Sequence, residues 1–232
     1  MLLDIIRNGK LDAQTIIELL LYLVIILISL SVHELSHGYV AYRCGDATAR
    51  NLGRLTFNPL AHLYPLGTVM MLVFGFGYAK PVPINPRNFN HYKRDLCFVS
   101  LAGPFSNFLL AIIGAFLYYL SLILLPVEAL MSIPGSIWCS FCSSFMFANC
   151  SLAVFNLLPI PPLDGSRILS AALPGKLAYC YLKYEQYIML ILFVLLWQGA
   201  FDNVLSFLSS RLARFVLTVV SVILEPLVGL IR

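Results

Sequence analysis

The stretch that decides the fold is residues 19–37, which read LLLYLVIILISLSVHELSH. Its first part, Leu19 to Leu30, carries no charge, and the ionisable residues His33, Glu34 and His37 follow directly. An apolar run of this kind predicts a helix in a lipid bilayer, which about 20 mostly apolar residues can cross. Ionisable side chains at membrane depth are costly, so such a cluster indicates a functional site.

The composition of the whole chain agrees with a membrane protein. Of 232 residues, 60% are hydrophobic and only 11% are charged, whereas soluble domains are about one quarter charged. The net charge of +4 is small, and its scatter along the chain argues against a nucleic-acid partner. We therefore expect an all-α polytopic membrane protein whose surroundings are a lipid bilayer.

Five apolar stretches approach the length needed to cross a bilayer. They cover about residues 15–41, 96–125, 137–158, 179–201 and 204–231. The fifth is interrupted by Arg211, Arg214, Glu225 and Pro226, so spanning and lying in the interface both remain open for it. We predict one transmembrane domain over residues 1–232, with a core at about 15–170 and C-terminal helices at about 179–231.

The region between the first two stretches cannot form a spanning helix. Prolines interrupt residues 51–90 repeatedly, yet Thr68 to Tyr78 is strongly apolar. Irregular backbone within a bilayer survives only where protein or water satisfies its polar groups. We therefore expect a re-entrant, β-hairpin-like loop that lines a cavity.

The basic residues indicate an orientation. The connection at 126–135 has no Lys or Arg, whereas 160–178 contains Arg167 and Lys176. Residues 43–95 contain Arg43, Arg50, Arg54, Lys80, Arg87, Lys93 and Arg94. Because basic loops stay in the cytoplasm, we expect a multi-pass protein of the cell membrane with the polar cluster toward the cytoplasmic side.

The His33-Glu34-Leu35-Ser36-His37 segment has the pattern H-E-x-x-H. Two histidines four residues apart lie on one helical face, so both imidazoles can reach one zinc ion. The neighbouring Glu34 can then act as general base toward a water molecule. A polar network that only joins helices is the structural alternative.

A catalytic zinc site usually has three protein ligands, and His62, His91, Asp164 and Glu185 are candidates for the third. Topology favours Asp164. The first and third apolar stretches both run inward, and the third leads directly into the proline-rich segment that ends at Asp164 and Gly165. An Asp that merely caps the next helix is the alternative for this residue.

Six motifs in order resemble the site-2 protease family of intramembrane zinc metalloproteases. They are HELSHG at 33–38, GDATAR at 45–50, GRLTFNP at 53–59, AKPVP at 79–83, AGPFSN at 102–107 and NLLPIPPLDG at 156–165. The resemblance covers about residues 30–170 and is closest to short bacterial and archaeal members without PDZ or CBS domains. The pair formed by H-E-x-x-H and N-x-x-P-x-P-x-L-D-G is the specific part.

The resemblance implies a core of three helices with flanking helices, and one zinc ion per chain below the cytoplasmic membrane surface. It implies His33, His37 and Asp164 as ligands and Glu34 as catalytic base. Asn156 matches a position near the active site, where we expect it to contact substrate or the developing oxyanion, and His62 is a candidate for a supporting contact. Residues 80–83 resemble a strand that pairs with an extended substrate.

The function that follows is hydrolysis of peptide bonds in a membrane protein or membrane-anchored peptide. Two other classes remain open. The same His, Glu and Asp residues would suit a membrane carrier for metals or other ions, although no symmetric halves of the transporter kind are present. An inactive scaffold would keep the fold, but a structural zinc site needs no base at Glu34.

Overall fold

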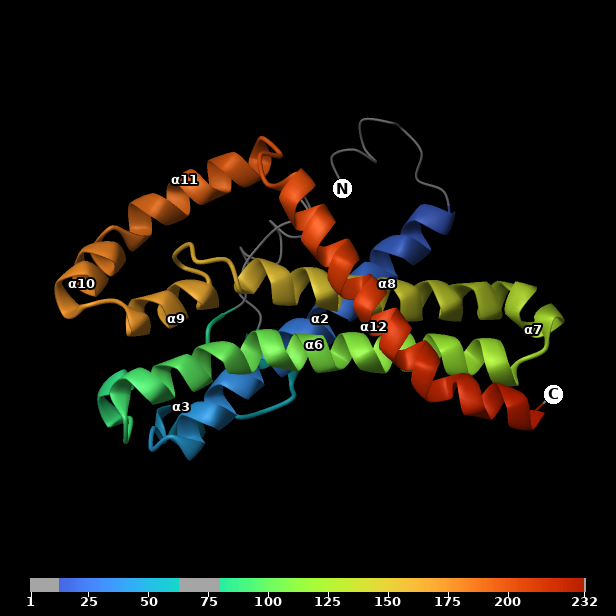
Figure 1. Cartoon of the computed structure of the whole chain (residues 1–232), viewed down its shortest axis with the longest axis horizontal. Coiled ribbons are helices and arrows are strands. Elements are labelled where there is room, and N and C mark those ends of the chain that lie inside the picture. The colour runs from blue at the N-terminus through green and yellow to red at the C-terminus, as the bar shows by residue number, and fades with distance from the viewer. Residues whose placement is uncertain (1–12, 63–79, 232) are drawn as a thin grey trace. The chain divides into compact units, whose positions relative to one another are not determined.

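The computed structural model describes residues 13–62 and 80–231, with only the backbone described for 227–231. Within these residues all regular structure is helical, which confirms the all-α prediction (Figure 1). The elements are α2 (Ala13–Arg43), α3 (Thr48–Asn51), α4 (Pro59–His62), the 3-10 helix η1 (Pro86–Asn88), α6 (Tyr92–Leu124), α7 (Val127–Met131), α8 (Ile133–Asn156), α9 (Asp164–Ala172), α10 (Gly175–Lys183), α11 (Glu185–Trp197) and α12 (Asp202–Ile231). The re-entrant loop predicted around Thr68 to Tyr78 lies outside the described residues.

Four helices in the described part of the chain are long and apolar enough to cross a membrane. They are α2, α6, α8 and residues 202–226 of α12, and they coincide with four of the five predicted stretches. The protein is thus an all-α polytopic membrane protein. The fifth predicted stretch forms one continuous helix through Arg211 and Arg214, with Pro226 inside it.

The fourth predicted stretch, 179–201, is long and apolar enough to cross a membrane only as a bent pair of helices. Two helices, α10 and α11, replace one continuous segment and meet at an angle of 56°. The break falls at Tyr184, between Lys183 and Glu185. Glu185 is held by Arg167 of α9, so an ion pair lies at the point where the apolar run alone predicts a single helix.

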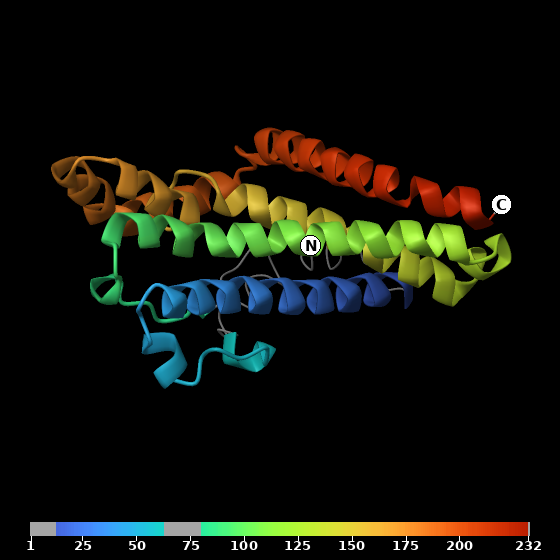
Figure 2. The ribbon, with the colours of Figure 1, turned by 60° about the horizontal axis from the view of Figure 1, so that its bottom comes forward.

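The chain divides into two compact units, Met1–Asp95 and Leu96–Arg232, and the single domain over 1–232 stays a prediction. In the first unit, α3 and α4 pack against α2, as Figure 2 shows. Gly38 of α2 permits this packing, because a Cβ atom there would lie 2.7 Å from the Leu55 side chain and 3.0 Å from that of Val82. The loops after α2 therefore lie directly on the helix that carries the H-E-x-x-H pattern.

The second unit has a core built from α6, α8 and α12. Figures 1 and 2 show α6 and α8 side by side, with α7 between them in the chain, while α12 crosses α8. The core side chains are mostly small or β-branched: Ala111, Ala115, Met146, Cys150, Ala213, Val216, Val220 and Leu224. Small residues let helices approach closely where lipid supplies no hydrophobic driving force.

Polar side chains join α6 to α8 inside this core. The Asn107 amide donates to Asn149 Oδ1 over 2.9 Å, and the Trp138 indole donates to Ser121 Oγ over 2.7 Å. Both asparagines are fully buried. Buried groups of this kind need partners in an apolar surrounding, so the pairs fix the register of the two helices.

Candidate metal centre

The two histidines of the H-E-x-x-H pattern meet on one face of α2. The Nε2 atoms of His33 and His37 lie 3.0 Å apart, and the rings are edge to face. Both side chains are buried, with exposed fractions of 5% and 7%. Two nitrogens on one tetrahedral zinc, each at about 2.0–2.1 Å from the metal, would lie about 3.3 Å apart. The spacing therefore fits a shared metal ion.

The helix around this pair satisfies its own polar groups. The hydroxyls of Ser29, Ser31 and Ser36 donate to the backbone carbonyls four residues earlier, over 2.6–2.7 Å. Such bonds remove the cost of hydroxyls in an apolar helix. The other polar side chains of residues 31–37 are the two imidazoles and the Glu34 carboxylate.

Glu34 lies between the histidines in sequence and is partly buried. Its Oε2 atom accepts a 2.8 Å hydrogen bond from the backbone N–H of Val82. The two residues are separated by 48 positions. Sequence patterns gave no signal for this contact, although the Pro81-Val82-Pro83 sequence marked an unusual backbone.

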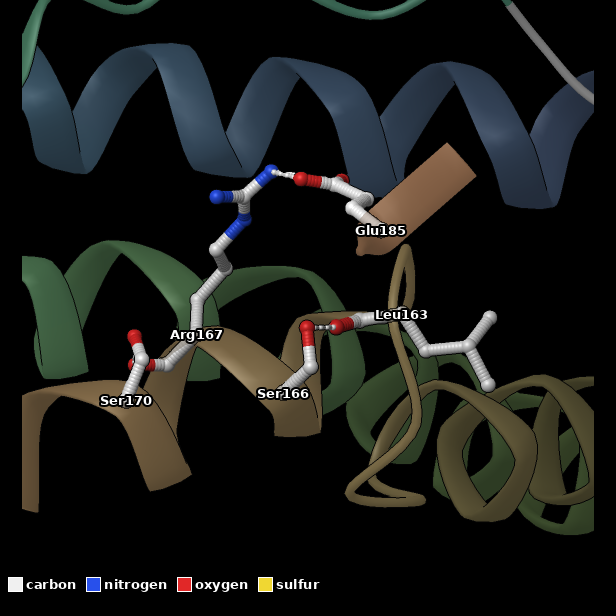
Figure 3. Close-up of polar contacts among 5 residues, drawn as sticks. All are labelled: Leu163, Ser166, Arg167, Ser170 and Glu185. Atoms are coloured by element: carbon white, nitrogen blue, oxygen red, sulfur yellow. Dashed lines mark hydrogen bonds and ion pairs between the residues drawn. The ribbon is translucent and has the colours of Figure 1, made fainter. Parts of the chain in front are cut away.

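Asp164 is the first residue of α9, and only Leu163 separates it from the proline-rich segment 159–162. Gly165 must be glycine, because a Cβ atom there would lie 2.2 Å from the Leu157 carbonyl oxygen. The Ser166 hydroxyl donates to the Leu163 carbonyl over 2.6 Å (Figure 3). The start of α9 is therefore fixed by close packing and by a local hydrogen bond.

One turn further along α9, Arg167 is tied to a distant element. Figure 3 shows its guanidinium beside the Glu185 carboxylate, with Nη2 at 2.7 Å from Oε1 and 2.9 Å from Oε2. The side chains are 38% and 27% exposed. This ion pair connects the helix that begins at Asp164 to the start of α11.

The remaining predicted residues each have a definite place. His62 is buried in α4, and its Nε2 lies 2.9 Å from the Thr56 carbonyl oxygen. Asn156 ends α8, where its amide donates to the Leu152 carbonyl over 3.0 Å. His91 is exposed. Residues 80–83, expected as a strand, belong to no strand.

The donor types suit zinc. His33 and His37 offer buried imidazole nitrogens, and Asp164 offers a partly buried carboxylate oxygen. Zinc in catalytic sites takes nitrogen and oxygen ligands of these kinds and keeps one position open. Beside a bound metal, Glu34 would supply a carboxylate that is able to move a proton.

Comparison with known proteins identifies relatives that are named as zinc metalloproteases. The family model described as peptidase family M50 matches residues 21–136 and 125–198. A Bacillus subtilis (strain 168) protein named "Putative zinc metalloprotease YwhC" is 44% identical over 182 residues, which is 77% of this chain and 82% of the relative.

More distant relatives carry names of the same kind. The Mycolicibacterium smegmatis protein "Putative zinc metalloprotease Rip2" is 30% identical over 76% of this chain and 66% of its own length. The Methanocaldococcus jannaschii protein "Putative zinc metalloprotease MJ0611" is 30% identical over 59% of this chain and 62% of its own length. No solved structure matches the chain.

Proposed function

Because the chain belongs to peptidase family M50, we propose that it is an intramembrane zinc metalloprotease that hydrolyses peptide bonds of membrane-spanning or membrane-anchored substrates. The observation that carries the proposal is the 3.0 Å approach of His33 and His37 Nε2. This pair lies in a helix that is apolar and long enough to cross a membrane. Ionisable residues are costly in a membrane-spanning helix, so their presence there indicates a functional site.

The proposed ligands are His33, His37 and Asp164, with one zinc ion per chain. The other candidates for the third ligand are less suitable. Glu185 is in an ion pair with Arg167, the Nε2 atom of His62 is at the Thr56 carbonyl, and His91 is exposed. Asp164 stands in the motif that, with H-E-x-x-H, characterises site-2 proteases, and Gly165 fixes the backbone beside it.

When bound, zinc supplies Lewis-acid polarisation of the scissile carbonyl and makes a water molecule more acidic. We assign the proton transfers to Glu34, which takes a proton from the attacking water and delivers it to the leaving amine. The Val82 N–H holds Oε2 of this carboxylate, so Oε1 is the oxygen better placed to receive the proton.

Asn156 and His62 have supporting roles in this proposal. The Asn156 amide uses one hydrogen on the Leu152 carbonyl, and a side-chain amide has a second hydrogen to donate. That second hydrogen suits a substrate carbonyl or a developing oxyanion. His62 supports the backbone at Lys80, because its carbonyl accepts a hydrogen bond from the Lys80 N–H over 2.8 Å.

The proposed location is the cell membrane, with the metal centre toward the cytoplasmic side. The support is the distribution of basic residues between the connections 43–95 and 126–135 and the tendency of basic loops to stay in the cytoplasm. The substrate helix would have to unwind locally, since helical hydrogen bonds shield its carbonyl groups.

Cleavage by purified protein in liposomes tests the proposal. A panel of tagged single-span substrates is incubated with wild type and with Glu34→Gln, and the products are identified by mass spectrometry. We expect wild type alone to cut, at a bond within or beside the span. Zinc flux through liposomes without cleavage, unchanged by Glu34→Gln, would favour a carrier and refute the proposal.

A further inference from the structure

The segment from Lys80 to Asn90, called the strap below, is bound to the rest of the first unit at both ends and in the middle. It contains η1 but otherwise has no regular structure. A segment without helix or strand hydrogen bonds must find other partners for its backbone. Those partners determine what the strap can do.

At its first end the strap is held by Arg54 and His62. The Lys80 N–H donates to the His62 carbonyl over 2.8 Å. Arg54 Nη2 lies 3.0 Å from the Lys80 carbonyl oxygen and 3.4 Å from that of Pro81. Charged donors make stronger hydrogen bonds than neutral ones, so Arg54 is the main side-chain anchor at this end.

In the middle, Val82 stands between two prolines. Pro81 and Pro83 have no N–H, so Val82 carries the one amide hydrogen of these three residues, and it is donated to Glu34. The Val82 side chain is buried, 5% exposed, and lies against Gly38 one turn further along α2. Both the backbone and the side chain therefore seat this residue on the H-E-x-x-H helix.

At its second end the strap is held by Asp46. This carboxylate is fully buried and accepts hydrogen bonds from the Asn85 N–H over 2.7 Å and from Asn88 Nδ2 over 2.8 Å. The Asn90 N–H donates to the Cys44 carbonyl over 2.9 Å. Gly45 allows the close approach of the two segments, because it has φ of 107° and a Cβ atom there would lie 2.8 Å from the Asn88 backbone carbonyl oxygen.

We propose that the strap positions the Glu34 carboxylate, and that Arg54 is the positioning residue that keeps the Val82 N–H on it. The inference rests on the proposed function, in which Glu34 moves protons. A glutamate side chain has several rotatable bonds, and catalysis requires reacting groups to be held close to the productive geometry. The strap supplies that restraint from the backbone.

The same contacts change the expectation that residues 80–83 pair with an extended substrate. The Lys80 N–H and carbonyl, the Pro81 carbonyl and the Val82 N–H are all engaged within the first unit. A substrate strand would have to displace them. The proposal assigns these groups of the strap to the base, and pairing of residues 80–83 with a substrate stays a prediction.

Hydrogen–deuterium exchange of the strap tests the contact without any need for activity. Pro81 and Pro83 leave Val82 as the single reporter in residues 81–83. We expect exchange at Val82 to rise by about tenfold in Arg54→Met, the order for loss of one or two hydrogen bonds. Arg54→Lys, which keeps a charged donor, restores part of the protection, and Arg87→Met, at an exposed position of the same strap, leaves it unchanged.

A second pair of variants examines the acceptor. Glu34→Gln keeps an oxygen for the Val82 N–H, whereas Glu34→Leu removes it at similar size. We expect protection to persist in Glu34→Gln and to fall in Glu34→Leu. Equal exchange in wild type, Arg54→Met and Glu34→Leu would overturn the proposal, whether or not the protein cleaves a substrate.

Kinetics separate positioning from substrate binding. With a cleaved substrate, Arg54→Met is expected to lower kcat by about tenfold or more while KM changes little, because the lost interaction acts on the base. Zinc content should stay at the wild-type level. A raised KM with unchanged kcat would show that the strap grips substrate and would refute its assigned role. If wild type cuts nothing, the proposed function fails and the exchange experiment alone decides the strap.

Discussion

The side-chain amide of Asn107 donates to Asn149 Oδ1 over 2.9 Å, and both residues are fully buried between α6 and α8. Asn149 also donates to the Phe145 carbonyl of its own helix. Hydrogen bonds between membrane helices contribute about 0.6 kcal/mol on average and up to about 1.7 kcal/mol. The pair therefore links the two helices as well as satisfying the buried amides.

A double-mutant cycle tests this link. Asn107→Ala and Asn149→Ala should each lower the free energy of unfolding, with a coupling energy of about 0.6–1.7 kcal/mol between them. Unfolding in mixed micelles gives the free energies of unfolding of wild type, the two single variants and the double variant. A cycle between Asn107→Ala and Ser143→Ala serves as control, since the Ser143 hydroxyl donates to the Ser140 carbonyl of its own helix. Coupling no larger than in the control would contradict the link.

Close helix packing at Gly114 gives a second prediction. A Cβ atom there would lie 2.9 Å from the Met146 backbone nitrogen and 3.2 Å from the Cys142 carbonyl oxygen. Because backbone cannot move aside easily, Gly114→Ala should destabilise the protein by about 1–3 kcal/mol. Gly175→Ala is the matched control, as its Cβ would meet no atom within 4 Å. Thermal unfolding that shows equal effects of the two changes would refute the close approach.

Asp46 makes stability depend on pH. Burial raises the pKa of this carboxyl, but hydrogen bonds from Thr48, Asn85 and Asn88 outweigh burial and bring the pKa below its ordinary value. A group with a lowered folded-state pKa stabilises the protein above its unfolded pKa, about 3.9 for Asp, and loses this contribution as pH falls through the folded value.

Asp46→Asn should consequently lower Tm at pH 7 by about 4–8 °C, the shift for about 2 kcal/mol in a chain of this size. The difference in Tm between wild type and variant should be constant near neutrality and should become smaller as pH falls below about 4. Melting curves in detergent across this range provide the measurement. Glu128→Gln, at an exposed site, should show no such gap, and a gap that widens in acid would contradict the assignment.

The Arg167–Glu185 pair predicts a charge-swap rescue. Reversal of one charge, in Arg167→Glu or Glu185→Arg, places like charges together and should lower Tm by about 2–4 °C, corresponding to about 1 kcal/mol for a partly exposed pair. The double swap should recover at least half of the loss. If the double variant melts no higher than the worse single variant, the pair does not hold α9 to α11.

Sequence patterns predicted the parts of the fold that depend on local composition. The apolar run before His33 predicts α2 from its length and composition. The four-residue spacing predicts that His33 and His37 lie on one face, because of the helical period. The existence of α6 and α8 follows from their apolar length, although each helix begins four residues before the predicted apolar stretch, at Tyr92 and Ile133.

The contacts that complete the site could not be predicted in this way. The Val82 N–H reaches Glu34 across 48 positions, and no periodic pattern encodes such a pairing. The break between α10 and α11 falls beside Glu185, and the partner of Glu185, Arg167, lies outside both helices. Hydrophobic pattern gives the length of an apolar segment but not the place where it bends.

The most direct test of the central claim measures zinc and cleavage in the same purified samples. Wild type is compared with His33→Ala, Glu34→Gln, Asp164→Ala and, as control, His91→Ala, with zinc per chain determined by mass spectrometry. We predict about one zinc in wild type, His91→Ala and Glu34→Gln, and zinc binding weakened by more than about 100-fold in His33→Ala and Asp164→Ala, since even outer partners of a metal ligand change affinity by about 10–100-fold. Only wild type and His91→Ala should cut. Equal zinc in all five proteins, or cleavage by Glu34→Gln at the wild-type rate, would contradict the account.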